Sequence, residues 1–344
     1  MTPIERAWYR DARWLTLLAP LEGLYRLLAG RRRQAYLEGR RTVWLPPVPV
    51  IVVGNLSVGG TGKSPLVAWL VRWLQMQGWQ PGIVSRGYGG KAASYPLLVS
   101  PATPVAQSGD EPLMLAQQTG VAVAVDPDRP RAARALLEQA GCDIVIADDG
   151  LQHYALGRTL ELAVVDGARG FGNRRCLPRG PLREPLARLG EVDALVGNGG
   201  FSALQADDGL RVDGEQRTPR FAMTLVPVGW RHLLDGCRRP VTESPAAAGE
   251  SVAAIAGIGH PQRFFDTLDA LGIAHEAYPF SDHHRFSAVD LPAASTILMT
   301  AKDGVKCADL ADARCWVLDV EARPEPDFEA WLREQLEALA MARD

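Results

Sequence analysis

The sequence contains no long apolar run and no cysteine pattern that would staple a small fold. The chain has 344 residues with five scattered cysteines and no Cys-x-x-Cys spacing. This odd count argues against a disulfide framework and a zinc site, and it is typical of a reducing cytoplasm. The densest apolar stretch, residues 14–21, is much shorter than the ~18 residues that a membrane-spanning helix needs. No small-residue cleavage site follows it, which argues against a signal peptide.

Internal repeats and low-complexity tracts are also absent. Hydrophobic residues make up 47% of the chain and charged residues 22%, which excludes a disordered, collagen-like or coiled-coil protein. The length suits two domains. The net charge of −3 indicates no nucleic-acid partner. No feature of the sequence indicates an obligate protein partner.

Positive charge is concentrated at the N-terminus. Residues 1–47 hold nine arginines against four acidic residues, which indicates an anionic partner. Apolar residues recur here at helical spacing and form one face: Trp14, Leu17, Leu18, Leu21, Leu24, Tyr25 and Leu28. This pattern is typical of a helix lying in a membrane interface, and a helix docked on the protein's own core would show it too. Pro20 is expected to kink the helix in either case.

From residue 48 onward, short apolar runs alternate with helical patterns, which predicts an α/β fold with a parallel sheet covered on both faces. The strands expected first are 48–54, 82–85, 96–99, 121–125, 143–147, 161–165 and 193–196, with helices at 63–77, 110–119 and 128–140. A polar stretch at about 200–250 predicts loops around a strand pair. The second series has expected strands at 252–256, 275–280, 296–300 and 315–320, with helices at 261–271 and 326–341.

The strongest local signal is a glycine-rich loop within 51-IVVGNLSVGGTGKSPLVAWLVRWL-74. Strand, loop and helix in this order are the context of a phosphate-binding P-loop. Lys63 would reach the β- and γ-phosphates of a nucleotide, and the Ser64 hydroxyl would ligate Mg²⁺. The expected nucleotide-binding residues are Ser57, Val58, Gly59, Gly60, Thr61, Gly62, Lys63 and Ser64. The strict pattern has glycine in place of Ser57, and a simple strand–helix turn is the alternative interpretation.

A second signal, 143-DIVIADDGLQH-153, runs from four apolar residues into two carboxylates, as in a Walker B strand. Asp148 and Asp149 are therefore expected at the carboxyl edge of a parallel sheet, where open α/β sheets bind ligands. A carboxylate there can hold Mg²⁺ opposite Ser64. Glu184 is a further metal candidate, and the sequence leaves open which of these acids touches the ion.

Eight segments together resemble the tetraacyldisaccharide 4'-kinases, the lipid A kinases of Gram-negative bacteria. In chain order they are VGNLSVGGTGK, SRGYGG, GDEP, VDPDRP, DDGLQH, GPLREP, DHH and TAKDGVK. The resemblance covers nearly the whole chain. It implies transfer of the γ-phosphate of ATP, with Mg²⁺, to the 4'-hydroxyl of tetraacyldisaccharide 1-phosphate, which gives lipid IVA.

The resemblance also implies roles for individual residues. Asp110 is expected as the catalytic base and His283 as its partner, with His284 left open as an alternative, and Lys63 completes the catalytic set. The candidate substrate-binding residues are Arg86, Tyr88, Arg129, His153 and Arg183. An acylated substrate lies in a bilayer, which favours peripheral attachment of the chain to the cytoplasmic face of the bacterial inner membrane.

The predicted organisation has four parts: an amphipathic membrane-associated segment 1–47, a P-loop kinase domain 48–218, a linker 219–250 with a probable strand pair, and a smaller C-terminal α/β domain 251–344. A cleft is expected between the two α/β domains.

Two other function classes stay open at this point. The first is a nucleotide-switch NTPase with a deviant P-loop. It would carry a signature lysine where this chain has Val58, and a guanine-reading NKxD motif is absent. The second is a non-catalytic membrane scaffold with a degenerate nucleotide site, which the intact Lys63, Ser64 and paired aspartates argue against.

Overall fold

One hydrogen-bonded sheet of thirteen strands organises the structure, a computed structural model that describes residues 2–203 and 218–341. The first half of the chain supplies β1 (Val50–Gly54), β2 (Pro81–Ser85), β3 (Leu97–Val99), β4 (Val123–Val125), β5 (Ile144–Asp148), β6 (Leu160–Asp166) and β7 (Ala194–Asn198). The second half supplies β8 (Arg220–His232), β9 (Arg238–Pro240), β10 (Val252–Ala256), β11 (Glu276–Pro279), β12 (Thr296–Thr300) and β13 (Cys315–Pro324). Their spatial order is β11-β10-β12-β13-β8-β7-β6-β1-β5-β2-β4-β3, with β9 beside β8. The predicted α/β fold is confirmed.

Helices cover both faces of the half that carries the P-loop. They are α3 (Lys63–Met76), α4 (Val105–Ser108), α5 (Asp110–Thr119) and α6 (Arg129–Ala140). Strand β1 has every residue buried: Ile51 and Val53 pack in a cluster with α3 and α5, and Val50 and Val52 pack in a cluster with α6. Such double burial explains why the strands are continuously apolar rather than alternating.

The second unit repeats this arrangement on a smaller scale. Its helices are α7 (Gln262–Ala270) and α8 (Ala301–Cys307), which pack in separate clusters with alternate residues of β10 and β12. The sequence did not predict α8. The helix has seven residues and includes Gly304, so its apolar pattern is too short to detect. Thr300 starts it, because the Thr300 side chain accepts a hydrogen bond from the backbone of Asp303.

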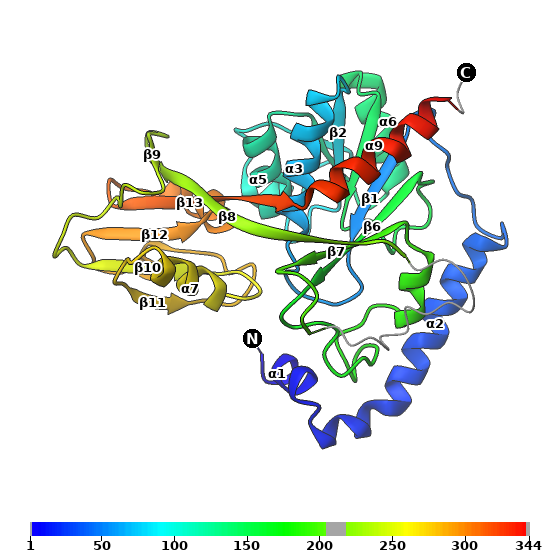
Figure 1. Cartoon of the computed structure of the whole chain (residues 1–344), viewed down its shortest axis with the longest axis horizontal. Coiled ribbons are helices and arrows are strands. Elements are labelled where there is room, and N and C mark those ends of the chain that lie inside the picture. Colours follow the sequence, from blue (N-terminus) through cyan, green and yellow to red (C-terminus); the bar gives the residue numbers. More distant parts are fainter. Residues whose placement is uncertain (1, 204–217, 342–344) are drawn as a thin grey trace.

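Strands β8 and β13 join the two units into the single sheet. The first residues of β8 pair with β7, and the rest pairs antiparallel with β13, with an irregularity between Asp319 and Val320. Figure 1 shows the two strands running together from one unit to the other. The strand pair expected in 219–250 is present as β8 with β9. Helix α9 (Pro326–Met341) then returns to the P-loop unit, where the rings of Phe328 and Trp69 lie 5.6 Å apart.

The N-terminal segment forms α1 (Pro3–Arg10), a 3-10 turn over 13–18, and α2 (Ala19–Leu37). The kink expected at Pro20 does not occur, because α2 begins at Ala19 and Pro20 lies in its first turn. A proline costs nothing there, since the first backbone N–H groups of a helix have no partner within it. Trp8 and Glu22 hold the segment to the P-loop unit. Trp8 Nε1 donates to the carbonyl of Pro178 at 3.0 Å, and the Glu22 carboxylate accepts from the backbone of Cys176 at 3.1 Å.

The apolar face of this segment is largely uncovered by the described chain. Its most exposed members are Trp14 at 49%, Leu17 at 79%, Leu21 at 53%, Leu24 at 53% and Leu28 at 58%. Among the described residues, no helix combines the length and apolarity needed to cross a membrane. The uncovered residues thus form a surface along α2 and the turn before it, at the lower edge of the view in Figure 1.

Candidate active site

The P-loop joins β1 to α3, and its conformation requires glycine at position 62. Gly62 precedes the first turn of α3 with a φ of 98°. A Cβ placed on it would lie 2.6 Å from Nδ2 of Asn198. That nitrogen donates to the carbonyl of Thr61 at 3.1 Å and so fixes the end of the loop. The N-terminus of α3, with its partial positive charge, is thereby open toward a phosphate.

Lys63 is held in position by the loop and by the Walker B strand. Its Nζ lies 3.2 Å from Oδ1 of Asn55 and 3.5 Å from Oδ1 of Asp149. The Asn55 amide also donates to the carbonyl of Gly59 at 3.3 Å. Sequence reasoning gave Asn55 no role, although it stands directly after β1, within the quoted VGN segment. The lysine is therefore oriented by two polar groups before any phosphate arrives.

Asp148 ends β5 and has one carboxylate oxygen without a partner. Its Oδ2 accepts from Ser85 Oγ at 3.3 Å, whereas buried Oδ1 has no hydrogen-bond partner among the described residues. Burial raises the pKa of Asp148 to about 7, and the charges of Glu111 and Asp149 add to the increase. Such an oxygen is suited to a cation that neutralises it.

Asp149 is engaged by two cations. Arg183 Nη1 donates to both of its oxygens, at 2.8 and 2.9 Å, and Lys63 approaches from the loop. Burial acts to raise the pKa of Asp149, but the charges of Lys63 and Arg183 outweigh it and hold the pKa well below its usual range. Asp149 therefore remains a carboxylate, and it is paired with these two cations.

Glu184 is also occupied. It is buried, accepts from Gln152 Nε2 at 3.0 Å, and takes a second hydrogen bond from the Tyr154 hydroxyl. Within residues 2–203 and 218–341, no three His, Cys, Asp or Glu side chains group as a metal site. Oδ1 of Asp148 has no partner among the described residues, and Ser64 lies in the wall of the same cavity with its hydroxyl as a second possible ligand. Two such oxygens, completed by phosphate and water oxygens, fit the ligand preference of Mg²⁺.

Asp110 and His283, which are 173 positions apart, form a hydrogen-bonded pair. His283 Nδ1 lies 2.9 Å from Oδ2 and 3.2 Å from Oδ1 of Asp110, the first residue of α5. Burial acts to raise the pKa of Asp110, but the hydrogen bond from His283 and the charge of Lys302 leave it below its ordinary value. His284 instead lies 3.4 Å from Asp290 and stacks on Phe280. The geometry favours the pairing of Asp110 with His283.

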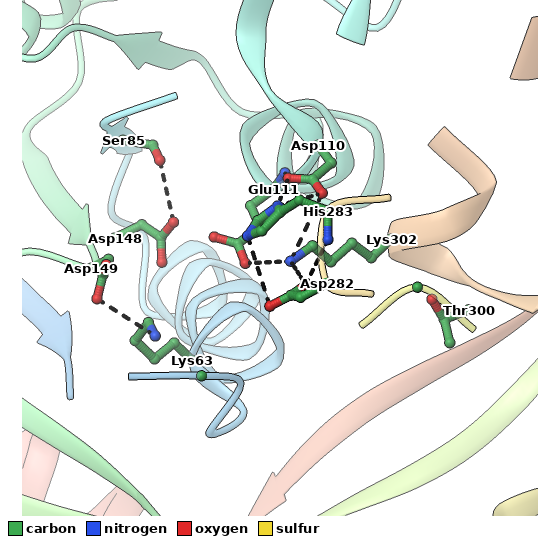
Figure 2. A network of polar contacts seen from close by, with 12 residues as sticks. Lys63, Ser85, Asp110, Glu111, Asp148, Asp149, Asp282, His283, Thr300 and Lys302 are labelled. Atoms are coloured by element: carbon green, nitrogen blue, oxygen red, sulfur yellow. Dashed lines mark hydrogen bonds and ion pairs between the residues drawn. The ribbon is translucent and has the colours of Figure 1, made fainter. Parts of the chain in front are cut away.

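Lys302 belongs to the same network of polar contacts as Asp110 and His283, which Figure 2 shows in close-up. Its Nζ is 3.0 Å from Asp282 Oδ1, 3.1 Å from Glu111 Oε1 and 3.8 Å from Asp110 Oδ2. Lys302 lies in the TAKDGVK segment of the family resemblance, but no role for it was expected from the sequence. A lysine directly after a parallel strand and at the start of a helix was the available signal, because this is the sheet edge at which ligands bind.

One cavity of about 1520 Å³ connects these groups. Its wall includes the P-loop, Asp148 and Asp149, then Glu111, His283 and Lys302, and it continues to Tyr25 and Arg32 of α2. A single small-molecule pocket measures roughly 300–1,000 Å³. The cavity can therefore hold a nucleotide and a second substrate together.

A family model described as "Tetraacyldisaccharide-1-P 4'-kinase" matches residues 14–337. The chain belongs to this family. It is 48% identical over 335 residues to the tetraacyldisaccharide 4'-kinase of Pseudomonas paraeruginosa, covering 97% of this chain and 96% of the relative. The protein of that name from Pseudomonas syringae pv. tomato is 46% identical over 336 residues, with 97% of each chain covered.

A solved structure agrees with the family assignment. It is that of LpxK from Aquifex aeolicus, described as an "apo" form in complex with ATP, and its TM-score is 0.78 at 28% sequence identity. The match covers 94% of this chain and 99% of the Aquifex chain. The family fold therefore extends over both units of the sheet.

Four of the five residues that the family resemblance suggested for the substrate line the cavity: Arg86, Tyr88, His153 and Arg183. The Tyr88 ring packs 4.8 Å from that of His283. Burial, followed by the charge of Arg129, lowers the pKa of His153 to about 3. The imidazole of His153 is thus uncharged at neutral pH and offers a hydrogen bond rather than a charge.

Arg129 lies elsewhere, behind the cavity wall. It is 1% exposed and donates to the backbone carbonyls of Asp126 at 3.0 Å and Asp148 at 3.2 Å. Burial lowers the pKa of Arg129 to about 10, so it is still protonated at neutral pH. Its position gives no support to a substrate contact. It instead braces the ends of β4 and β5, and with them the aspartates.

The second unit touches the P-loop itself, a contact that sequence reasoning missed. Arg263 of α7 donates to Oδ1 of Asp166, at the end of β6, at 2.6 Å. A Cβ on Gly259 would lie 2.9 Å from the backbone nitrogen of Gly60. The loop after β10 therefore packs against the tip of the P-loop, and only a residue without a side chain fits there.

Proposed function

We propose that this chain transfers the γ-phosphate of ATP to the 4'-hydroxyl of tetraacyldisaccharide 1-phosphate, giving lipid IVA, the 4'-phosphorylated precursor of lipid A. Family membership and curated relatives named for this kinase activity, aligned over 97% of the chain, support it. The observation that carries it is the Asp110–His283 pair at the wall of the cavity that also contains the P-loop. A nucleotide switch transfers the phosphoryl group to water and needs no space for a second substrate, so it is not favoured.

The nucleotide phosphates are proposed to lie at the N-terminus of α3. Lys63 reaches the β- and γ-phosphates from its position beside Asn55, and Arg183 adds a second cation held by Asp149. The Aquifex relative, described as a complex with ATP, supports ATP as the donor. Ser64 and Asp148 would hold Mg²⁺, which neutralises phosphate charge when bound. Glu184 is proposed to orient Gln152 rather than to touch the metal, because two donors already occupy it.

The Asp110–His283 pair, called the dyad below, is proposed to accept the proton of the attacking hydroxyl. His283 lines the cavity, whereas Asp110 is 4% exposed and lies behind it. We therefore refine the expected roles: the imidazole meets the hydroxyl, and the Asp110 carboxylate orients the ring and stabilises the charge that it gains. Removing either member should abolish the pathway for the proton.

The acylated substrate is proposed to enter from an anionic membrane surface. The cavity extends to Tyr25 and Arg32 of α2, next to the exposed leucines of the same segment. Leucine, tryptophan and arginine on one surface suit the membrane interface, and each arginine near anionic lipid adds about 1 kcal/mol. We propose peripheral attachment at the cytoplasmic face of the bacterial inner membrane, and the exposed apolar side chains of this segment support the attachment.

A phosphate-transfer assay tests the function. Purified protein in detergent micelles receives labelled ATP, Mg²⁺ and tetraacyldisaccharide 1-phosphate, with Lys63→Ala as the control. Label should move to the lipid in the wild type and not in the variant. Label released only as inorganic phosphate, at the same rate with or without the lipid, would overturn the kinase and favour the nucleotide switch.

A further inference from the structure

The dyad lies in a cluster with more acids than bases. Asp110 and Glu111 come from α5, and Asp282 precedes His283 in the loop after β11. Lys302 is the cation that contacts all three carboxylates, at distances from 3.0 to 3.8 Å. Its side chain is only 13% exposed. The Asp110 side chain is 5% exposed, but those of Glu111 and Asp282 are 29% and 32% exposed, so solvent screens the Lys302 contacts only in part.

The backbone of Lys302 is fixed by its own turn. Neighbouring Asp303 is fully buried, and both of its oxygens accept from the backbone nitrogen of Gly257 at 3.1 Å. Lys306, one turn later, is committed to the Asp303 carboxylate at 2.8 Å. Lys302 is therefore the lysine of α8 that contacts Asp110 of the dyad, because Lys306 is paired with Asp303.

We infer that Lys302 is a positioning residue for phosphoryl transfer: its ammonium group holds the Asp110–His283 pair in the unprotonated state and ties the His283 loop to α5. The inference rests on the proposed kinase function. Without this cation, the carboxylates of Asp110, Glu111 and Asp282 would face one another in a partly buried cluster. Protons would then bind the cluster at higher pH, and the loop that carries His283 would be repelled from α5.

The charges around the dyad are consistent with this role. The groups that face it are Glu111 from α5, Asp282 from its own loop, Lys302 and Lys306 from α8, and the Tyr88 ring. Burial acts to lower the pKa of Lys302, but Glu111, Asp110 and Asp282 raise it overall, so the ammonium stays charged throughout the working pH range.

The test is the pH profile of lipid phosphorylation, measured as kcat, for three variants. Lys302→Met keeps most of the stem and removes the charge. We expect kcat to fall about 10- to 100-fold with the KM for ATP unchanged, and the acidic limb to move up by about 1–2 pH units. Lys302→Arg should restore the limb. Asp282→Asn removes a negative neighbour and should move the limb down.

Opposite shifts in the two charge variants are the deciding result, because lost packing would not move the limb in opposite directions. Acidic limbs that stay at the wild-type pH in Lys302→Met and Asp282→Asn would overturn the inference. If Lys302→Met shows no cooperative thermal unfolding, Asp282→Asn alone decides it. A wild type that leaves the lipid unlabelled refutes the kinase function itself, which is a different outcome from an unchanged profile.

Discussion

Three leucines of α2 offer a quantitative test of the membrane-facing surface. Leu21, Leu24 and Leu28 are 53%, 53% and 58% exposed. Burying a whole leucine side chain is worth roughly 1.5–3 kcal/mol, so burying the exposed half contributes about 1 kcal/mol. Replacing all three by serine should therefore cost about 3 kcal/mol of membrane affinity, which corresponds to a roughly 100-fold change in the partition constant.

The assay is sedimentation with vesicles that contain anionic lipid, over a range of lipid concentrations. Leu234→Ser is the matched control, because Leu234 is 62% exposed and lies in the turn between β8 and β9, far from α2 in Figure 1. The triple variant should need about 100-fold more lipid for half-binding, while the control binds as the wild type does. Equal binding of all three proteins would refute the assignment of this surface to the membrane.

Three further changes test the site. Asp110→Ala should reduce turnover at least 100-fold while ATP still binds, as measured by calorimetry; unchanged turnover would exclude Asp110 from the mechanism. Gly62→Ala should weaken ATP binding and cost about 2–3 kcal/mol in chemical unfolding, because the positive φ is strained and the new Cβ meets Asn198; wild-type stability would contradict this geometry. Because the pKa of His153 is lowered to about 3 in the folded state, the unfolded chain takes up this proton first as the pH falls below about 6.5. His153→Gln should therefore lose less stability than the wild type between pH 7 and pH 4.5, and identical stability curves would contradict the lowered pKa.

Local patterns explain why much of the fold could be predicted. The P-loop and the Walker B strand are contiguous segments, so glycines, Lys63 and the paired aspartates can be interpreted without knowing what packs on them. The strands of both units are nearly continuous apolar runs with clear ends. The short helix α8 was not predicted, because its seven residues span only about two helical turns and include Gly304, which is too little for a periodic apolar pattern.

Long-range contacts were accessible only through the family resemblance, or not at all. The Asp110–His283 pair joins residues from the two units, and no periodicity indicates such a contact. The network of Lys302 draws on three segments, and its lysine is ordinary in sequence. For Arg129 the family resemblance suggested a substrate contact, and only the structure reveals that its buried side chain donates to the backbone carbonyls of Asp126 and Asp148. The sequence predicts the apolar face of α2, but only the structure shows that the described chain leaves this face uncovered.

The pairing of strands β8 and β13 also sets the distance between the two parts of the active site. These strands connect the unit that carries the P-loop to the unit that carries His283 by their antiparallel pairing, which is interrupted only by the irregularity between Asp319 and Val320. A slip of one residue in this pairing would displace the second unit by about 3.3 Å and turn every side chain to the opposite face. That displacement is larger than the 2.9 Å distance between His283 Nδ1 and Asp110 Oδ2. The register of these two strands thus sets whether the proton acceptor is assembled at all.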